Sequence, residues 1–260
     1  MFIVELTYPG TWLDYEDDEW SWEMRKLVQM LENPLTEACL ALALFEQQRA
    51  KPRDKPDREQ WEEDSNRRRE IEKELEAELN VDPFDPEDRQ ELYSSVEREL
   101  RLEKWESGEL PKQYSHRLIF MHAKSFLFAV DRIEKILGAI AEKDGVPDEV
   151  VEAKDAFEDI FPDLRGVRNT VAHIEDRGRG LDHRKEDLDL KPVQNRLVNA
   201  PGGGALILES LNGNEFGSTM SDGHYGEVEI SLENIVKVCE CIQNVIDALE
   251  WSGPQMHYPR

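Results

Sequence analysis

The sequence predicts a mainly α-helical fold that carries one small β-sheet near its C-terminal end. Apolar residues recur at helical spacing along most of the 260-residue chain. The period changes to two in "GALILES" (204–210) and "GEVEIS" (226–231), and the tight-turn signal Asn212-Gly213 lies between these segments. We therefore expect mainly helices, with a β-hairpin or a three-stranded sheet inserted at about residues 203–230.

Residues 1–110 are predicted to form a charged helical N-terminal region, to which the sequence assigns no role. Pro34 is expected to kink or interrupt its first long helical segment. The polar stretch "SGELPK" (107–112) predicts a domain boundary. The expected elements are a short strand within 1–16, a helical segment up to about residue 50, a highly charged helix at 58–80 and a further helix at 87–106.

Residues 111–260 are predicted to form a second domain, a bundle of helices around the β insertion. The longest of these helices has a broad apolar face. Its members are Leu118, Met121, Phe126, Val130, Ile133, Leu137 and Ile140. The expected helices run from a cap at Ser115 to about residue 143, from 148 to 160, from a cap at Asp163 through Asp176, and from a cap at Ser231 onward.

The charge of the chain restricts its partners. Lys and Arg total 32 against 57 Asp and Glu, which gives a formal net charge of -25. Such a charge repels nucleic acids and anionic membranes, so an RNA partner would need a locally basic surface. No stretch approaches the roughly 20 apolar residues that span a bilayer, and the N-terminus lacks the pattern of a signal peptide. The three cysteines have no zinc-binding spacing. We expect a cytoplasmic protein with reduced thiols and no bound metal.

The short segment "VRNTVAH" (167–173) combines side chains suited to acid–base and phosphate chemistry. On a helix, Asn169 and His173 lie one turn apart on one face, and the long side chain of Arg168 can reach the edge of that face. Such a pattern also arises by chance, since a histidine on a helix is more often an ordinary core or surface residue. The segment is therefore a candidate site, and the sequence around it decides between a functional and a structural interpretation.

That context resembles the HEPN superfamily (higher eukaryotes and prokaryotes nucleotide-binding). Its ribonuclease members carry an arginine followed four to six residues later by histidine, commonly with a polar residue directly after the arginine; Arg168, Asn169 and His173 match this pattern. The resemblance covers roughly residues 115–251. It implies a helical bundle and a metal-independent endoribonuclease that acts as a homodimer, often as a toxin or in antiphage defence. The β insertion departs from a minimal four-helix form, and Glu175 stands where some members have a modified tyrosine.

These residue types suffice for RNA cleavage without a metal or another cofactor. A histidine can take the proton of the 2′-hydroxyl or protonate the leaving 5′-oxygen. An arginine can hold the scissile phosphate and stabilise the charge that develops on it, while Asn169 can orient the imidazole or a phosphate oxygen. One chain supplies only one such histidine, so separate acid and base roles require two copies of the motif. We expect a homodimer with Arg168, Asn169 and His173 as catalytic residues.

The segment around the motif is basic although the chain is acidic. Residues 163–185 contain six Lys or Arg and four Asp or Glu. These cations suit either RNA phosphates or the C-terminal end of a helix. The candidate RNA-binding residues are Arg165, Arg177, Arg179 and Arg184. The expected partners are an RNA substrate, a second copy of the chain, and an antitoxin or regulatory protein.

Two other functions remain open. The first is a non-catalytic HEPN-like module that dimerises or binds a nucleotide or partner, with the motif serving only the structure. The second is an acidic interaction protein, even a nucleic-acid mimic, in which the charge of the chain is the function. This second alternative requires acidic rows on one exposed face and a buried Arg–His patch whose polar groups are satisfied.

Overall fold

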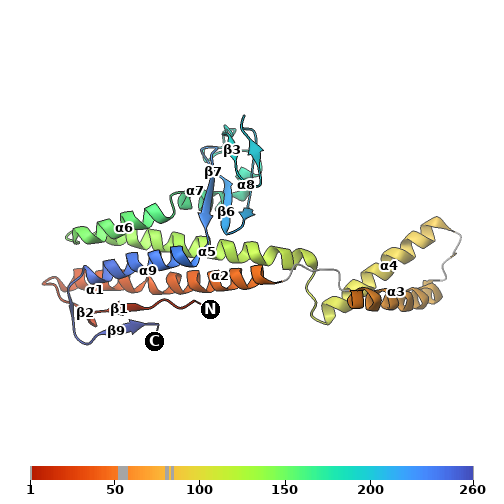
Figure 1. Cartoon of the computed structure of the whole chain (residues 1–260), viewed down its shortest axis with the longest axis horizontal. Helices are drawn as coiled ribbons and strands as arrows, with labels where there is room; N and C mark the ends of the chain where they lie inside the picture. Colours follow the sequence, from red (N-terminus) through yellow and green to blue (C-terminus); the bar gives the residue numbers. More distant parts are fainter. Residues whose placement is uncertain (1, 52–57, 80–81, 83–84, 260) are drawn as a thin grey trace. The chain divides into compact units, whose positions relative to one another are not determined.

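The computed structural model describes residues 2–51, 58–79, 82 and 85–259, and the chain is mainly helical (Figure 1). It consists of two compact units. The main unit comprises Met1–Gln47 and Phe120–Arg260, and the hairpin unit comprises Gln48–Ile119. This division differs from the boundary predicted at residue 110, because the first 47 residues belong with the C-terminal half.

Helices account for most of the described residues, and none of them is both long and apolar enough to cross a membrane. The helices are α1 (Asp18–Gln29), α2 (Glu32–Ala50), α3 (Arg58–Leu79), α4 (Pro86–Glu106), α5 (Lys112–Ala141), α6 (Asp148–Ile160), α7 (Leu164–Ala172), α8 (Ile174–Arg177) and α9 (Leu232–Asp247). The strands are β1 (Leu6–Tyr8), β2 (Trp12–Leu13), β3 (Val193–Gln194), β4 (Asn199–Ala200), β5 (Ser210–Asn212), β6 (Glu215–Thr219), β7 (Tyr225–Glu229), β8 (Trp251–Ser252) and β9 (Met256–Tyr258).

The N-terminal strand is held to the C-terminal part of the main unit from two directions. β1 pairs with β9 in an antiparallel register that places Leu6 opposite Tyr258. Toward α9, the Thr7 amide donates to Oε1 of Gln243 at 2.9 Å, and Nε2 of Gln243 donates to the Thr7 carbonyl at 2.8 Å. These partners lie 236 residues apart in the sequence. Such long-range hydrogen bonds explain why the N-terminal residues belong to the main unit and do not form a domain with α3 and α4.

The core of the main unit is built from the apolar sides of α2, α5, α6 and α9. Phe45, Phe126 and Phe157 from three of these helices are no more than 1% exposed. The apolar face predicted for α5 is buried from Phe126 onward, whereas Met121 is 53% exposed. The stripe of α9 is buried throughout. Its members are Ile235, Val238, Ile242, Val245 and Leu249.

The hairpin unit consists of α3 and α4 packed against each other over a small apolar core. The buried residues of this core are Ile71, Leu92, Val96 and Leu100, with Leu75 packed against them. Charged side chains continue the contact between the helices. Arg67 donates to both carboxylate oxygens of Glu103 at 2.9 and 2.7 Å, and Nζ of Lys104 lies 2.6 Å from Asp64. The charged helix predicted at 58–80 is thus present, with one side covered by α4.

Several predicted helix ends differ from the structure. Pro34 lies in the first turn of α2, where its missing N–H is not needed. The helical segment is therefore interrupted before Pro34, between α1 and α2. Ser115 lies inside α5 and not before it. Asp163 makes no capping bond to α7; its Oδ2 accepts the backbone N–H of Glu227 on β7 at 3.1 Å. Ser231 caps α9 as predicted.

The β insertion forms a three-stranded antiparallel sheet in the order β5-β6-β7, within the predicted range 203–230. It packs against α7. The buried hydroxyl of Thr170 donates to the Thr219 carbonyl at 2.9 Å. Gly166 approaches Met220 so closely that a Cβ at this position would lie 2.1 Å from its sulfur. The sheet therefore covers one side of the helix that carries the candidate motif.

We expect Ile71→Ala to open the hairpin unit while the main unit stays folded. Removing a buried isoleucine costs about 2–5 kcal/mol, which is large for a two-helix hairpin whose described core has so few members. Hydrogen exchange measured by mass spectrometry should quicken in α3 and α4 and stay unchanged in α9. Tyr93→Ala, at a 63% exposed position of α4, is the matched control. Equal exchange in both variants would contradict this account of the hairpin.

Candidate functional site

The motif helix α7 is anchored on one side and ends at the motif histidine. Leu164, Val167 and Thr170 are buried against the rest of the main unit. The helix ends at Ala172, and His173 adopts φ −123° and ψ 43° before α8 begins. The continuous helix predicted through residue 176 is therefore wrong at His173. The interruption turns the next four residues off the axis of α7 and leaves the histidine at its C-terminal end.

Arg168 points from α7 toward α5 and pairs there with a buried carboxylate. Its Nε donates to Oδ1 of Asp131 at 2.7 Å. The Asp131 side chain is only 4% exposed, and its Oδ2 accepts a hydrogen bond from Lys135 at 2.7 Å. Asp131 was not predicted from the sequence. A lone acidic residue within the apolar face of α5, in the run "FAVDRI" (128–133), was the signal that could have found it.

The pair leaves part of the guanidinium available. The Arg168 side chain is 18% exposed. Among the described residues, its two Nη atoms have no hydrogen-bond partner, and neither is a buried unpaired atom. Arginine donates through a rigid fork of five N–H groups. One edge of this fork therefore holds Asp131, while the other can bind an anion at the surface.

A second carboxyl group lies near this ion pair. Burial raises the pKa of Glu134, and the negative charge of Asp131 raises it further. The positive charges of Arg165 and Arg168 act in the opposite direction. The surroundings of Arg168 are therefore mixed in sign, so an incoming phosphate must compete with neighbouring carboxylates for the guanidinium.

His173 is open to solvent. Its side chain is 60% exposed, and its Nδ1 lies 4.0 Å from Oε1 of Glu175, which is itself 65% exposed. Asn169 is half-buried, and its carbonyl accepts the His173 amide at 3.0 Å. Within the described part of the chain, no hydrogen bond or ion pair joins the side chains of Arg168, Asn169 and His173 to one another. The structure thus places Arg168 and Asn169 on α7 and His173 at its C-terminal end, without contact between their polar side-chain groups.

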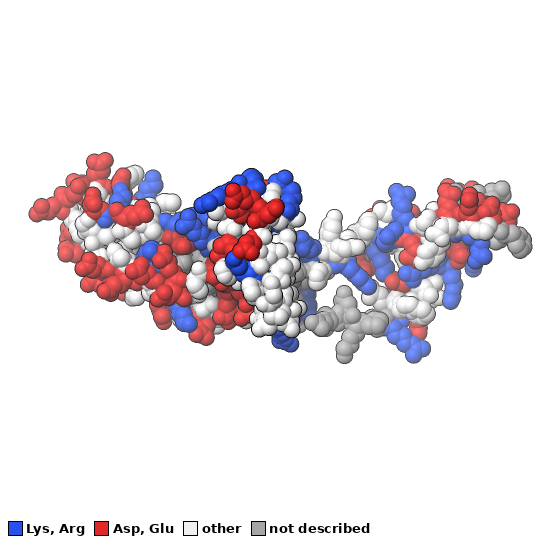
Figure 2. All heavy atoms as spheres, turned by 90° about the horizontal axis from the view of Figure 1, so that it is seen from above, with Lys and Arg blue, Asp and Glu red and all other residues white. Residues whose placement is uncertain are grey.

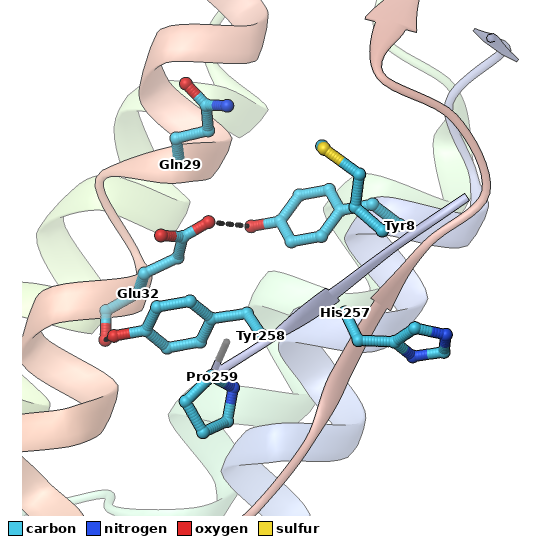
Figure 3. A pocket seen from close by; sticks show the side chains of 7 residues that line it. Tyr8, Gln29, Glu32, His257, Tyr258 and Pro259 are labelled. Carbon is cyan, nitrogen blue, oxygen red and sulfur yellow. Dashed lines mark hydrogen bonds between the residues drawn. The ribbon is translucent and has the colours of Figure 1, made fainter. Parts of the chain in front are cut away.

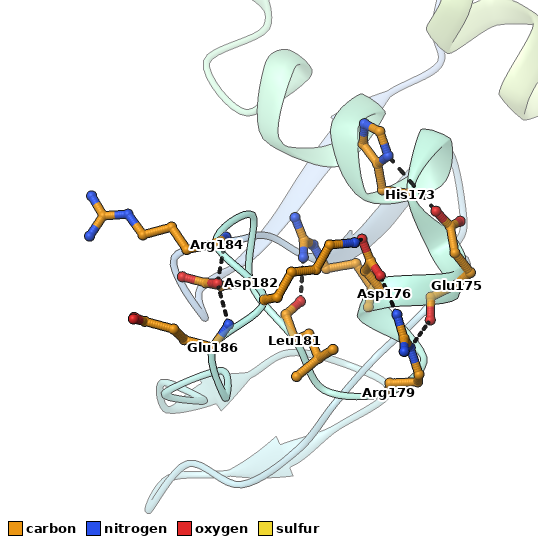
Figure 4. Close-up of polar contacts among 10 residues, drawn as sticks. His173, Glu175, Asp176, Arg179, Leu181, Asp182, Arg184 and Glu186 are labelled. Carbon is orange, nitrogen blue, oxygen red and sulfur yellow. Dashed lines mark hydrogen bonds and ion pairs between the residues drawn. The ribbon is translucent and has the colours of Figure 1, made fainter.

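The basic loop after α8 is organised around Asp176 (Figure 4). Asp176 is buried and pairs with Lys185 and, at 2.6 Å, with Arg179. The hydrogen bond from Lys185, followed by that from Arg179, holds the pKa of the Asp176 carboxyl below its usual range. Arg177 is 2% exposed and donates to the Leu181 carbonyl. Arg177 is therefore an internal support of the loop, too deeply buried to serve as an RNA contact.

The other three predicted RNA-contacting arginines lie at the surface. Arg165 and Arg184 are exposed, and the Arg179 side chain remains 63% exposed beside Asp176. In Figure 4, the Arg184 side chain extends away from the loop that carries it. Figure 2 shows acidic residues crowded over one end of the main unit, whereas Lys and Arg lie among acidic residues near the β insertion. The basic segment predicted from the sequence is thus a surface feature next to α7.

A separate pocket of about 520 Å³ lies between α2 and the paired strands β1 and β9 (Figure 3). In Figure 1, these strands lie on the side of the main unit opposite to α7. The Tyr8 hydroxyl donates to Glu32 Oε1 at 3.0 Å, and the hydroxyls of Tyr258 and Thr36 lie 2.7 Å apart. The His257 side chain turns away from the pocket. The hydroxyls of Tyr8 and Tyr258 each have a polar partner on α2, which favours a structural joint between strand and helix over a reaction site.

Within the described residues, no group of three or more His, Cys, Asp or Glu side chains is arranged to hold a metal ion. The three thiols are free. Cys39 and Cys241 are buried, and burial raises the pKa of each to about 11. Thiols with such pKa values are poor nucleophiles at neutral pH. The titratable groups of the candidate site are therefore those of α7 and its immediate surroundings.

We expect replacement of the two motif residues to affect stability unequally. Arg168→Ala removes one of the two partners of the buried Asp131 carboxylate and should lower the free energy of unfolding by about 1–3 kcal/mol. His173→Ala removes an exposed side chain and should change it by less than about 0.5 kcal/mol. Urea denaturation followed by circular dichroism measures both. A larger loss for His173→Ala than for Arg168→Ala would contradict the contacts described above.

No protein-family model, curated protein or solved structure matches the chain. Its function is therefore inferred from its own residues and contacts, together with the resemblance of the motif.

Proposed function

We propose that the protein is a metal-independent endoribonuclease of the HEPN type whose active site is completed in a homodimer. One observation carries the proposal. Arg168 is fixed through its Nε to the buried Asp131, its two Nη atoms have no hydrogen-bond partner among the described residues, and it lies on the same short helix that ends at the exposed His173. A braced guanidinium and an accessible imidazole are the groups that phosphodiester cleavage by an internal nucleophile requires.

The reaction uses the 2′-hydroxyl of the RNA. One His173 takes the proton of this hydroxyl, and the resulting oxygen attacks the adjacent phosphorus. Arg168 stabilises the negative charge that develops on the non-bridging oxygens. The second imidazole protonates the 5′-oxygen as its bond to phosphorus breaks. The products are a 2′,3′-cyclic phosphate and a 5′-hydroxyl. One proton leaves the 2′-hydroxyl and one is given to the 5′-oxygen, so the reaction needs no metal or other cofactor.

Asp131 acts in this proposal as a positioning residue for Arg168. Its carboxylate fixes one edge of the guanidinium, so less side-chain freedom is lost when the other edge binds a phosphate. Asn169 is half-buried on the same helix and can orient a phosphate oxygen or the imidazole. The surface arginines Arg165, Arg179 and Arg184 would hold the flanking RNA backbone against the repulsion of the acidic chain.

The resemblance to HEPN proteins also implies a biological role for the proposed ribonuclease. A ribonuclease of this kind can serve as a toxin or in antiphage defence in the cytoplasm, under control of an antitoxin or regulatory protein. A non-catalytic HEPN-like module is the second candidate. The ion pair between Arg168 and Asp131 favours it, because that contact alone gives Arg168 a structural role.

Purified protein should cleave single-stranded RNA in the presence of EDTA and leave 2′,3′-cyclic phosphate ends, because the nucleophile belongs to the substrate. His173→Ala should abolish cleavage and largely spare binding, since the exposed imidazole supports no packing. Gel analysis of end-labelled RNA, with phosphatase and kinase treatment of the ends, measures both points. Glu175→Ala, which removes the exposed neighbour of His173, is the control. Undiminished metal-free cleavage by His173→Ala would move the site away from α7.

Replacing Arg179 and Arg184 together by glutamate should weaken RNA binding. Each lost phosphate contact reduces the dependence of log affinity on log salt by roughly 0.7 for a single strand. Fluorescence anisotropy with labelled RNA, titrated at several salt concentrations in the His173→Ala background, gives the affinity and its slope. The control replaces Lys26 and Lys237 by glutamate, which changes the net charge equally on other helices. Identical slopes in the two double variants would show that only overall charge matters.

A further inference from the structure

The proposed active site does not use the pocket between α2 and the paired strands β1 and β9 (Figure 3). Its volume of about 520 Å³ lies within the range of cavities that bind small molecules. On the helix side it is lined by Gln29 of α1 and Glu32 of α2. On the strand side it is lined by Tyr8, Met256, His257, Tyr258 and Pro259. The pocket therefore combines polar groups from the helices with a mainly aromatic and apolar wall from the strands.

The Glu32 carboxylate in this pocket is held by a tyrosine and not by a cation. The buried Tyr8 hydroxyl donates to its Oε1 at 3.0 Å. Burial, followed by the negative charge of Glu32, raises the pKa of Tyr8, so the phenol keeps its proton and acts as the donor. Among the residues that the structure describes, Glu32 forms no ion pair, and its Oε2 accepts no hydrogen bond. The carboxylate can therefore still accept a hydrogen bond from a positively charged donor.

Two aromatic rings lie next to Glu32. In Figure 3, the side chains of Tyr8 and Tyr258 extend from the strands toward this residue. The Tyr258 hydroxyl lies 2.7 Å from that of Thr36 and donates to the Glu32 carbonyl at 3.4 Å, so hydrogen bonds hold the far end of the ring. Aromatic rings attract cations to their negative faces, and groups of rings bind organic ammonium ions in proteins. The two tyrosines therefore favour a ligand of the same charge as the carboxylate does.

The other polar group on the helix side is the amide of Gln29. Within the described part of the chain, this amide has no hydrogen-bond partner. Its carbonyl oxygen can accept a second N–H of an ammonium group, which has three to donate. On the strand side, Met256 and Pro259 offer apolar contact to a short hydrocarbon chain. The lining thus provides for both ends of an alkylamine.

Other classes of ligand fit this lining less well. A phosphate would meet the negative charge of Glu32 and no Lys or Arg among the described lining residues. The side chain of His257 turns away, and its Nδ1 lies 2.7 Å from Oε1 of Glu5. A metal ion would find a single carboxylate here, and no group of three His, Cys, Asp or Glu in the described chain could hold one. A purely apolar molecule would leave the carboxylate without water or a partner.

We propose that this pocket binds a primary ammonium group carried on a short hydrocarbon chain. The ammonium group donates to Glu32 and Gln29, and its charge lies against the tyrosine rings. The hydrocarbon chain contacts Met256 and Pro259. The net charge of -25 raises the concentration of such cations around the protein. The proposal does not rest on the ribonuclease, because the strands of the pocket lie on the side of the main unit opposite to α7 (Figure 1).

The first test compares n-butylammonium chloride with 1-butanol, its neutral counterpart of equal chain length, in ligand-observed NMR titrations at equal ionic strength. The wild type should bind the ammonium ion at least about tenfold more tightly than the alcohol, because only the cation makes a charge-assisted hydrogen bond. Because the ligand contacts helices and strands together in the folded protein, it should also raise the unfolding temperature. Equal affinity for cation and alcohol would overturn the proposal.

Glu32→Gln should weaken the binding of butylammonium by at least about tenfold. The new amide oxygen can still accept the Tyr8 hydroxyl, so the unfolding temperature without ligand should stay near that of the wild type. The matched control is Glu152→Gln, which removes the same charge from a second cavity, of about 620 Å³, lined by residues of α6 and α9. This control should bind as the wild type does. Unchanged binding by Glu32→Gln, or lost binding by Glu152→Gln, would assign the amine to another site.

Gln29→Lys tests the same pocket without changing Glu32. The lysine ammonium group would pair with the carboxylate and take the place of the ligand, so butylammonium binding should be lost from a protein whose circular dichroism is unchanged. Full binding by this folded variant would sink the proposal.

The same ammonium group occurs in free alkylamines and in the lysine side chains of peptides. Titration with Nα-acetyl-lysine methylamide distinguishes these sources. An affinity equal to that of butylammonium would support a lysine side chain as the ligand, and binding of butylammonium alone would support a free amine.

Discussion

The arrangement around α7 depends on one buried charge. Asp131 lies within the apolar face of the longest helix, where its side chain is 4% exposed. An ionised carboxylate at such a depth is unstable unless it is paired and hydrogen-bonded. Arg168 and Lys135 each supply a hydrogen bond at 2.7 Å. Because Arg168 comes from α7, the requirement to neutralise Asp131 fixes where this helix lies against α5.

The β insertion fixes the opposite side of the same helix. Thr170 donates into β6, and Asp163 accepts from β7. A Cβ at Gly166 would lie 2.1 Å from the sulfur of Met220, so a larger residue there would require this methionine side chain to move. The helix is therefore held between α5 and the sheet, while its C-terminal end with His173 is open to solvent. The insertion departs from a minimal four-helix form, and its contacts give it a definite role in positioning the motif.

Local patterns in the sequence predicted the elements well and their partners poorly. The apolar stripe of α9 and the strands near Asn212-Gly213 could be predicted, because helical periodicity and a tight turn each depend on residues that are close together in the sequence. The pairing of β1 with β9 could not, because its partners lie at opposite ends of the chain. The hydrogen bond of Asp163 could not be predicted either. An aspartate before a helix is typical of a helix cap, but here its carboxylate accepts the backbone N–H of a residue on β7.

The difference between local patterns and long-range contacts also explains what the sequence predicted of the candidate site. Arg168, Asn169 and His173 were found because their types and spacing carry chemistry that can be recognised locally. The burial of Arg177 was missed, since an arginine in a basic loop usually faces solvent, whereas here its guanidinium supports the turn through the Leu181 carbonyl. Met121 was expected in the core because its spacing fits the buried face of α5. It is instead more than half exposed, because helical periodicity alone does not show how far along a helix the apolar face stays covered.

Whether Arg168 can serve both the fold and a reaction depends on the geometry of its side chain. A lysine that neutralised Asp131 would bring a single ammonium group, and binding a phosphate would then draw that one charge away from the buried carboxylate. Arginine spreads its charge over a planar fork and donates from two edges. Nε holds Asp131, while the Nη atoms lie outside that contact. The buried carboxylate therefore need not lose its partner when a phosphate arrives, and the structural ion pair and the proposed catalytic role of Arg168 are compatible.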